Sequence, residues 1–101
     1  MSEDVFDITK DIAEPRVLIV EDMGALAEVM GDILENSGAK VKIVGDGEAG
    51  KQAVATFHPD IIITDQKLPK LRGDEMVLEL RKEGILKPVI MLSGFDTEDA
   101  V

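Results

Sequence analysis

The sequence contains no cysteine and no apolar run that approaches the length of a membrane span. Without cysteine, the chain can form neither a disulfide framework nor a metal site built on thiolates. The first residues, Met1 to Asp4, are acidic, which is unlike the basic start of a signal peptide. We therefore expect a cytoplasmic protein that does not associate with membranes.

Positive charge is scarce. Lysine and arginine total 11, against 21 aspartate and glutamate residues, and the formal net charge is −10. Nucleic-acid binding needs clustered basic side chains that neutralise phosphates, so we expect no nucleic acid to bind this chain. The acidic excess can serve solubility, or it can mark a site for a hard cation. Only the arrangement of the acidic residues separates these two interpretations.

The length of 101 residues, with 45% hydrophobic residues, predicts one domain with a single core. Residues 1–14 are rich in acid and precede Pro15. We interpret them as a flexible N-terminal arm, because Val5, Phe6 and Ile8 are too few to pack on their own. Docking of this short apolar segment onto the domain stays open. The domain itself is expected over residues 15–101.

Short apolar runs predict the strands of this domain. They cover residues 17–20, 41–44, 61–64 and 89–92. The run at 61–64 is continuous and mostly β-branched, which is typical of a strand in the middle of a parallel sheet. Lys42 interrupts the run at 41–44, as expected for a strand near the edge of a sheet.

Helical patterns separate the predicted strands. We expect helices over residues 24–37 and about 48–57, a third that Gly73 and Asp74 open and Gly84 closes, and the beginning of another at 96–99. The side chains expected to face the sheet are Leu26, Val29, Met30, Ile33 and Leu34 in the first helix, Ala49, Ala53, Val54 and Phe57 in the second, and Met76, Val77 and Leu80 in the third. Strict alternation of strands and helices predicts a doubly wound α/β fold, with a parallel sheet and helices on both faces.

Polar residues follow three of the predicted strands at their carboxyl ends. These residues are Glu21 and Asp22, then Asp65, then Ser93 and Gly94. In a doubly wound sheet such ends meet along one rim, where ligands bind. Closely packed carboxylates repel one another unless a cation compensates, and Mg²⁺ suits carboxylates combined with a substrate phosphate. Ser93 can donate a hydrogen bond to a phosphoryl oxygen, and Gly94 allows its N–H to approach closely. The sequence thus predicts magnesium-dependent phosphoryl chemistry with Asp65 as nucleophile.

These motifs resemble the receiver domain of response regulators, the CheY-like module of two-component signalling, over about residues 16–101. The matching positions are the acidic pair Glu21-Asp22, the signature Asp-x-x-Leu/Met-Pro-x-x-x-Gly at Asp65, Leu68, Pro69 and Gly73, and Ser93-Gly94. The resemblance implies a flavodoxin-like sheet of order 2-1-3-4-5.

The resemblance also implies a function. Asp65 would accept a phosphoryl group from a histidine kinase or a phosphotransfer protein. Mg²⁺ would be coordinated by Glu21, Asp22, Asp65 and the backbone carbonyl of Lys67. Ser93, Gly94 and Gln66 would contact the phosphoryl group, and Ser93 would report on it. A domain of this kind is a signalling switch rather than an enzyme, with at most self-phosphorylation and self-dephosphorylation.

The chain departs from the family pattern after Ser93 and Gly94, where only residues 95–101 follow. The family's fifth strand, the lysine that this strand carries, an aromatic switch residue and the last helix have no counterpart. We therefore expect a receiver domain that is incomplete at its C-terminus, with the fourth strand exposed as an edge. Such a chain is expected to form a homodimer, to exchange elements with a second copy, or to be only marginally folded.

Two other functions stay open at this point. One is a non-switching binding or dimerisation module that keeps the fold but lacks the catalytic lysine. The other is a Mg²⁺-dependent phosphatase of the haloacid-dehalogenase type, which is disfavoured because Lys67 stands where that family has a second aspartate. Lys67 can equally be a solvated side chain that relieves repulsion between acids. The single histidine, His58, is expected to cap a helix before Pro59.

Overall fold

The computed structural model describes residues 14–92 and shows a four-stranded parallel sheet. The strands are β1 (Arg16–Val20), β2 (Lys40–Val44), β3 (Ile61–Asp65) and β4 (Val89–Leu92), in the order β2-β1-β3-β4. This order confirms the predicted flavodoxin-like arrangement. It places β2 and β4 at the two edges of the sheet formed by the described residues.

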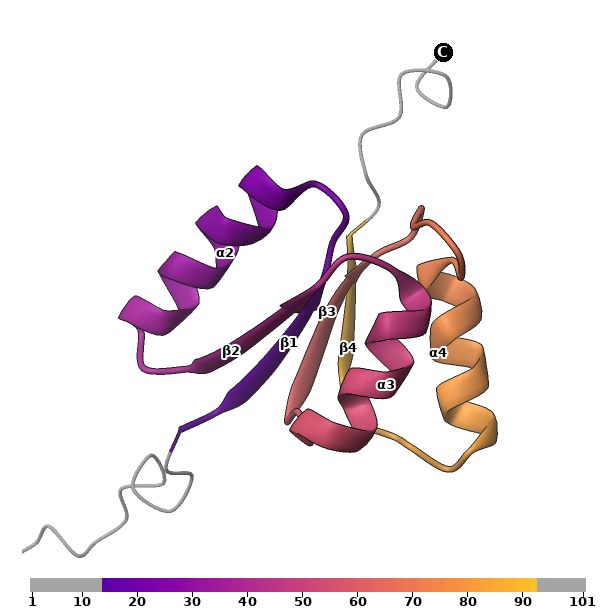
Figure 1. Ribbon diagram of the computed structural model, residues 1–101. Coiled ribbons are helices and arrows are strands. Elements are labelled where there is room, and N and C mark those ends of the chain that lie inside the picture. Colours follow the sequence, from indigo (N-terminus) through magenta and orange to yellow (C-terminus); the bar gives the residue numbers. More distant parts are fainter. Residues whose placement is uncertain (1–13, 93–101) are drawn as a thin grey trace, which may run out of the picture.

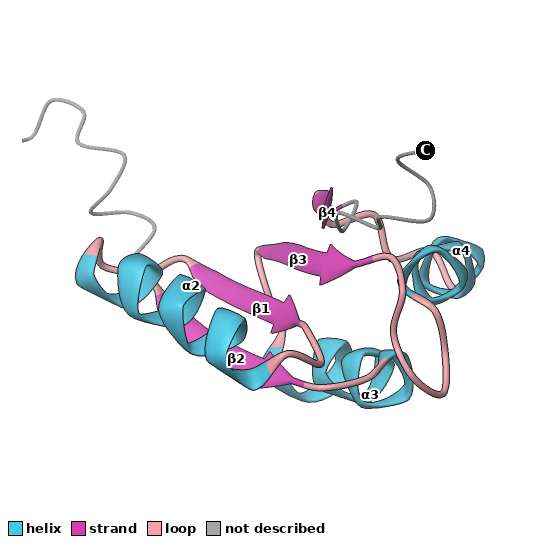
Figure 2. Ribbon diagram, turned by 90° about the horizontal axis from the view of Figure 1, so that it is seen from above, coloured by secondary structure: helices cyan, strands magenta, loops and turns pink. Residues whose placement is uncertain are grey.

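Within residues 14–92, three helices cover the two faces of this sheet (Figures 1 and 2). The helix α2 (Gly24–Asn36) lies on one face, mainly over β2 and β1. The helices α3 (Gly47–Phe57) and α4 (Gly73–Lys82) lie side by side on the other face. The doubly wound α/β architecture expected from the sequence is therefore confirmed.

Two hydrophobic cores result, one on each face of the sheet. In the central strand β1, Leu18 and Val20 belong to the core under α3 and α4, while Val17 and Ile19 belong to the core under α2. This division follows from the two-residue period of a strand, which points successive side chains to opposite faces. Because β1 has a neighbour on each side and helices on each face, all four side chains are buried.

The apolar stripe predicted for the first helix is only partly correct. Met30 and Leu34 pack on the sheet as expected, together with Ala27, which the prediction missed. Leu26, Val29 and Ile33 are 41%, 55% and 60% exposed. Five apolar positions at this spacing cover more of the helix circumference than one sheet face can bury. Because α2 lies close to β2, the side of the helix that faces the sheet is the side with the small residues Ala27 and Gly31.

Local signals place the ends of the helices close to the predicted positions. The carboxylate of Asp46 accepts a hydrogen bond from the N–H of Ala49 at 2.8 Å, which caps α3 and starts that helix one residue earlier than expected. His58 ends α3 with a left-handed φ of 53°, which confirms its expected capping position. Gly84 follows α4 with a φ of 83°.

Some expectations fall on residues that the structure does not describe. They are the arm over residues 1–14, of which only Glu14 is described, the helix beginning at 96–99, and the placement of Ser93 and Gly94. The boundary between arm and domain therefore stays a prediction. Among the described residues, no helix is both long enough and apolar enough to span a membrane.

Candidate metal centre

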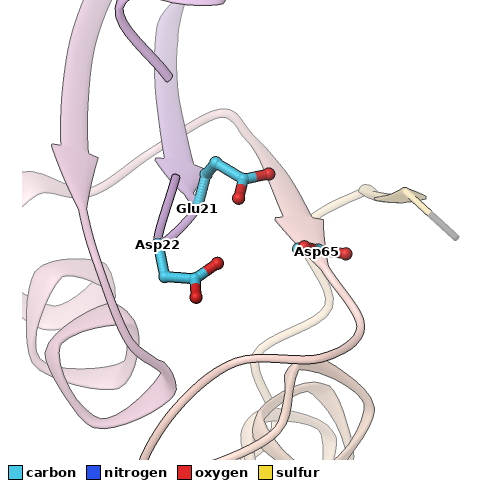
Figure 3. Close-up of side chains that lie close together, drawn as sticks. All are labelled: Glu21, Asp22 and Asp65. Carbon is cyan, nitrogen blue, oxygen red and sulfur yellow. The ribbon is translucent and has the colours of Figure 1, made fainter. Parts of the chain in front are cut away.

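The carboxyl ends of the neighbouring strands β1 and β3 bring three acidic residues together (Figure 3). Glu21 and Asp22 directly follow β1, and Asp65 is the last residue of β3. The parallel register, which pairs Val20 with Thr64, brings these strand ends to the same rim. Each residue offers one carboxylate oxygen, and these oxygens lie within 4.8 Å of one another.

Glu21 is the buried member of this acidic cluster, with an exposed fraction of 4%. Its Oε2 accepts a hydrogen bond from the N–H of Met23 at 3.0 Å, and its own N–H donates to the carbonyl of Val44 at 2.9 Å. Burial raises the pKa of the Glu21 carboxyl above its ordinary value, and the nearby charge of Asp65 raises it further, against the opposing hydrogen bond from Met23. A buried carboxyl among like charges is an unfavourable arrangement that a bound cation would relieve.

Asp65 is half-buried, and Asp22 is exposed. The Oδ1 of Asp65 accepts a hydrogen bond from the backbone N–H of Gln66 at 2.8 Å, which orients this carboxylate at the end of β3.

The side chain of Gln66 is half-buried, and its Nε2 lies 3.5 Å from Oδ2 of Asp74. The guanidinium of Arg72 lies 3.2 Å from Asp74 and lowers the pKa of that carboxyl. The sequence predicted Asp74 only as part of the helix start and indicated no role for Arg72, although the position of both residues beside that helix start was a usable signal.

A short loop, residues 66–72, leads from Asp65 to α4 and is held close to the acidic cluster. The N–H of Gly73 donates to the carbonyl of Gln66 at 2.9 Å and closes the loop. Leu68 anchors it in the core with an exposed fraction of 8%. Lys67, whose backbone carbonyl is a predicted Mg²⁺ ligand, lies in this loop with an exposed side chain.

The end of β4 adjoins the same rim. Leu92, the last described residue, is in register with Asp65, and its carbonyl accepts from the N–H of Gln66 at 3.3 Å. Of the predicted site residues, Glu21, Asp22, Asp65 and Gln66 are therefore brought together. Ser93 and Gly94 lie outside the described residues, so their roles stay predictions.

The chemistry of this cluster fits a hard divalent cation. All its donors are oxygens, as Mg²⁺ prefers, and carboxylates from two strands can bind one ion while leaving positions for water and a phosphate. The alternative that the acids serve only solubility does not explain why Glu21 is buried. The three carboxylates, with Asp65 half-buried at the end of β3, lie at the carboxyl rim of a doubly wound sheet, which is where such sheets bind ligands.

Comparison with known sequences identifies the class of protein. The family described as the response regulator receiver domain matches residues 17–101, so the chain belongs to that family. It is a signalling domain of two-component systems, and the resemblance seen in its motifs is confirmed.

Among the similar curated proteins is the alkaline phosphatase synthesis transcriptional regulatory protein PhoP of Bacillus subtilis, which is 35% identical over 83 residues. The alignment covers 82% of this chain and 35% of PhoP. The DNA-binding response regulator MtrA of Mycobacterium bovis is 31% identical over 91 residues, which are 90% of this chain and 40% of MtrA. The chain thus spans well under half the length of these relatives. The words "transcriptional regulatory" and "DNA-binding" in these names describe the whole proteins. The expectation that this chain binds no nucleic acid stays a prediction.

Solved structures agree with the assigned family. The receiver domain of Francisella response regulator 1452 has a TM-score of 0.78 and 32% identity, and the match covers 85% of this chain and 72% of that one. The N-terminal domain of the uncharacterised protein WS1339 of Wolinella succinogenes has a TM-score of 0.72 and 40% identity, with coverage of 85% and 69%. These similarities confirm the CheY-like fold.

Proposed function

We propose that this chain is a phosphorylatable switch in which Asp65 accepts a phosphoryl group with the help of Mg²⁺. The observation that carries the proposal is the approach of the Glu21, Asp22 and Asp65 carboxylate oxygens to within 4.8 Å at the ends of two adjacent strands. Receiver domains interact with histidine kinases or phosphotransfer proteins, and we propose such a protein as the phosphoryl donor.

In the proposed reaction, a carboxylate oxygen of Asp65 attacks the phosphorus of a phosphohistidine. An O–P bond forms, the N–P bond breaks, and the departing imidazole takes up a proton from solvent. Mg²⁺, when bound, neutralises charge on the transferring phosphoryl oxygens. The hydrogen bond from Gln66 to Oδ1 holds the Asp65 carboxylate in a fixed orientation before transfer.

The remaining roles follow the family pattern. Glu21, Asp22, Asp65 and the carbonyl of Lys67 hold Mg²⁺ in this proposal. Ser93, Gly94 and Gln66 contact the phosphoryl oxygens, and the resulting change around Ser93 alters the surface presented to a partner. This is a local charge event that biases an element with two states.

The proposal is tested by incubation with Mg²⁺ and acetyl phosphate, followed by intact mass measurement. We expect the parent to gain one phosphoryl group, and Asp65→Asn to gain none. Asp32→Asn, which changes an exposed aspartate on α2, is the matched control and should react like the parent.

Two further results are informative. Chelation of Mg²⁺ should prevent the gain in mass. A folded parent that gains no phosphoryl group in Mg²⁺ would contradict the proposal and favour the non-switching binding module. Hydrolysis of a phosphate monoester with many turnovers, dependent on Asp65, would instead indicate a phosphatase.

A further inference from the structure

The backbone of Gly47, the first residue of α3, lies directly against the backbone of Leu71. A Cβ at position 47 would overlap the carbonyl oxygen of Leu71, and it would lie 2.7 Å from its carbonyl carbon and 2.8 Å from its Cβ. Gly47 is buried and does not have a positive φ, so the close approach of two backbones, rather than a left-handed conformation, requires glycine here.

The contact joins two segments that are distant in the sequence. Leu71 belongs to the loop 66–72, which also carries Lys67, and Gly47 begins α3 directly after the turn that follows β2. A second contact supports the first, because Nζ of Lys70 lies 3.8 Å from Oδ2 of Asp46. Lys70 has a left-handed φ of 68°, so the loop adopts a strained conformation where it meets this turn.

We infer that Gly47 is a positioning residue for the metal centre, acting through the loop 66–72. This inference rests on the proposed function, since it assumes that the carbonyl of Lys67 binds Mg²⁺. The loop is fixed at one end by β3 and at the other by the hydrogen bond from Gly73 to Gln66. A side chain at position 47 pushes on Leu71 between these fixed ends, and the displacement passes toward Lys67.

The cation makes this displacement measurable. Mg²⁺ demands near-ideal octahedral geometry, so a small shift of one oxygen ligand lowers the affinity. Outer groups that orient metal ligands commonly change affinity by about 10- to 100-fold when they are altered. The glycine therefore contributes to cation binding although it offers no ligand atom of its own.

The test compares Gly47→Ala with Gly50→Ala in the same helix. A Cβ at Gly50 would lie 2.6 Å from Sδ of Met76 and 3.2 Å from a methyl group of Val20, so its strain falls in the core and not on the loop. Isothermal titration with MgCl₂ is expected to show a dissociation constant raised about tenfold in Gly47→Ala. The constant should be nearly unchanged in Gly50→Ala, even though both variants unfold at lower urea concentration than the parent. Equal constants in the two variants would overturn the inference.

A second variant distinguishes the positioning of the loop 66–72 from a simple steric clash caused by the methyl group added at position 47. Leu71→Gly removes a half-buried side chain that packs against the core, and it loosens the loop without adding any atom, so it decides the question if Gly47→Ala does not fold. We expect it to weaken Mg²⁺ binding in the same direction. Unchanged affinity in Leu71→Gly would contradict the positioning role.

Amide chemical shifts recorded without Mg²⁺ distinguish this inference from the proposed function. In Gly47→Ala, or in Leu71→Gly if the former does not fold, shift changes should extend from Leu71 back to Lys67. In Gly50→Ala they should instead centre on Val20 and Met76. A parent that binds no Mg²⁺ would refute the proposed function, whereas changes that stop at Leu71 would refute the role of Gly47 alone.

Discussion

The carbonyl oxygen of Asp65 lies so close to the Cα of Gly73 that a Cβ at position 73 would overlap it. The same Cβ would lie 3.0 Å from the carbonyl carbon of Asp65 and 3.0 Å from Oγ1 of Thr64, which donates to that carbonyl oxygen at 2.9 Å. The start of α4 therefore sits directly against the end of β3, and the position of the candidate phospho-acceptor depends on a glycine eight residues further along the chain.

Gly73→Ala should lower the free energy of unfolding by about 1–3 kcal/mol, because the added methyl group forces α4 away from the end of β3. It should also slow phosphorylation by acetyl phosphate, since Asp65 moves with its own carbonyl. Urea denaturation and intact mass measure these effects. Gly24→Ala is the matched control, because Gly24 is also the first residue of a helix and a Cβ there would meet no other described segment within 4 Å. If Gly73→Ala and Gly24→Ala changed the free energy of unfolding and the phosphorylation rate equally, Gly73 would have no special role at the end of β3.

Asp22→Asn should raise the free energy of unfolding in the absence of Mg²⁺ by about 1 kcal/mol at low salt, because it removes one of the mutually repelling charges. Saturating Mg²⁺ should reverse the order and make the parent the more stable protein. Thermal unfolding followed by circular dichroism with and without Mg²⁺ measures both effects. Asp32→Asn, on the exposed surface of α2, should show no such reversal. A parent that Mg²⁺ does not stabilise would contradict this prediction.

The raised pKa of Glu21 predicts how stability and cation binding depend on pH. Its ordinary value is 4.5, and in the folded protein burial shifts it upward. The unfolded chain therefore ionises first, and the contribution of Glu21 to metal-free stability is lost as pH rises through the raised pKa. Mg²⁺ binding requires the ionised carboxylate, so its affinity should increase over the same interval.

Glu21→Gln provides the measurement for this pH dependence. In this variant, the pH dependence of metal-free stability and the pH dependence of Mg²⁺ affinity should both lose the contribution of Glu21. The variant should also bind Mg²⁺ at least about tenfold more weakly at neutral pH. Titrations with MgCl₂ and urea denaturation from pH 4.5 to neutrality test it, with Glu28→Gln on the exposed surface of α2 as control. Profiles that are the same for Glu21→Gln and the parent would exclude Glu21 as the titrating group.

Arg16→Lys should lower the free energy of unfolding by about 1–2 kcal/mol without changing Mg²⁺ affinity. The Nε of Arg16 donates to the carbonyl of Phe57 at 2.8 Å, and its guanidinium lies 4.3 Å from the centre of the Phe57 ring. Lysine keeps the charge but cannot reproduce this geometry. Because Arg16 begins β1 and the acidic cluster lies at the other end of that strand, urea denaturation and MgCl₂ titration should separate the two properties. Reduced Mg²⁺ affinity would contradict the prediction.

The exposed apolar side chains of α2 predict that this helix can take part in self-association. Val29 is 55% exposed and Ile33 is 60% exposed on this helix. Val29→Glu should weaken self-association at least about tenfold, because a charge placed in an apolar contact loses its hydration. Sedimentation velocity over a range of concentrations measures the effect. Leu78→Glu is the matched control, since Leu78 is 58% exposed on α4, on the opposite side of the sheet. A parent that stays monomeric at all concentrations would contradict the prediction.

The sequence predicted the elements and the rim of the sheet well, because both depend on local patterns. Continuous apolar runs such as 17–20 and 61–64 identified the inner strands, and acidic residues directly after them marked the candidate site. The same local reasoning could not choose which apolar arc of α2 is buried. That choice depends on how closely α2 approaches β2, where Gly31 would place a Cβ 3.2 Å from Cδ1 of Ile43.

Local sequence patterns were enough to predict the alternation of strands and helices, the parallel sheet that this alternation requires, and the placement of Glu21, Asp22 and Asp65 at strand ends, while the order of the strands followed from the family resemblance. Periodicity and strand-end position are properties of neighbouring residues, so they can be read along the chain. Two relationships became known only from the folded molecule: Glu21 is buried while Asp22 is exposed, and Gly47 lies against the loop that follows Asp65. These relationships arise when segments distant in the sequence pack together, because burial, pKa shifts and backbone contacts depend on the atoms that folding brings near.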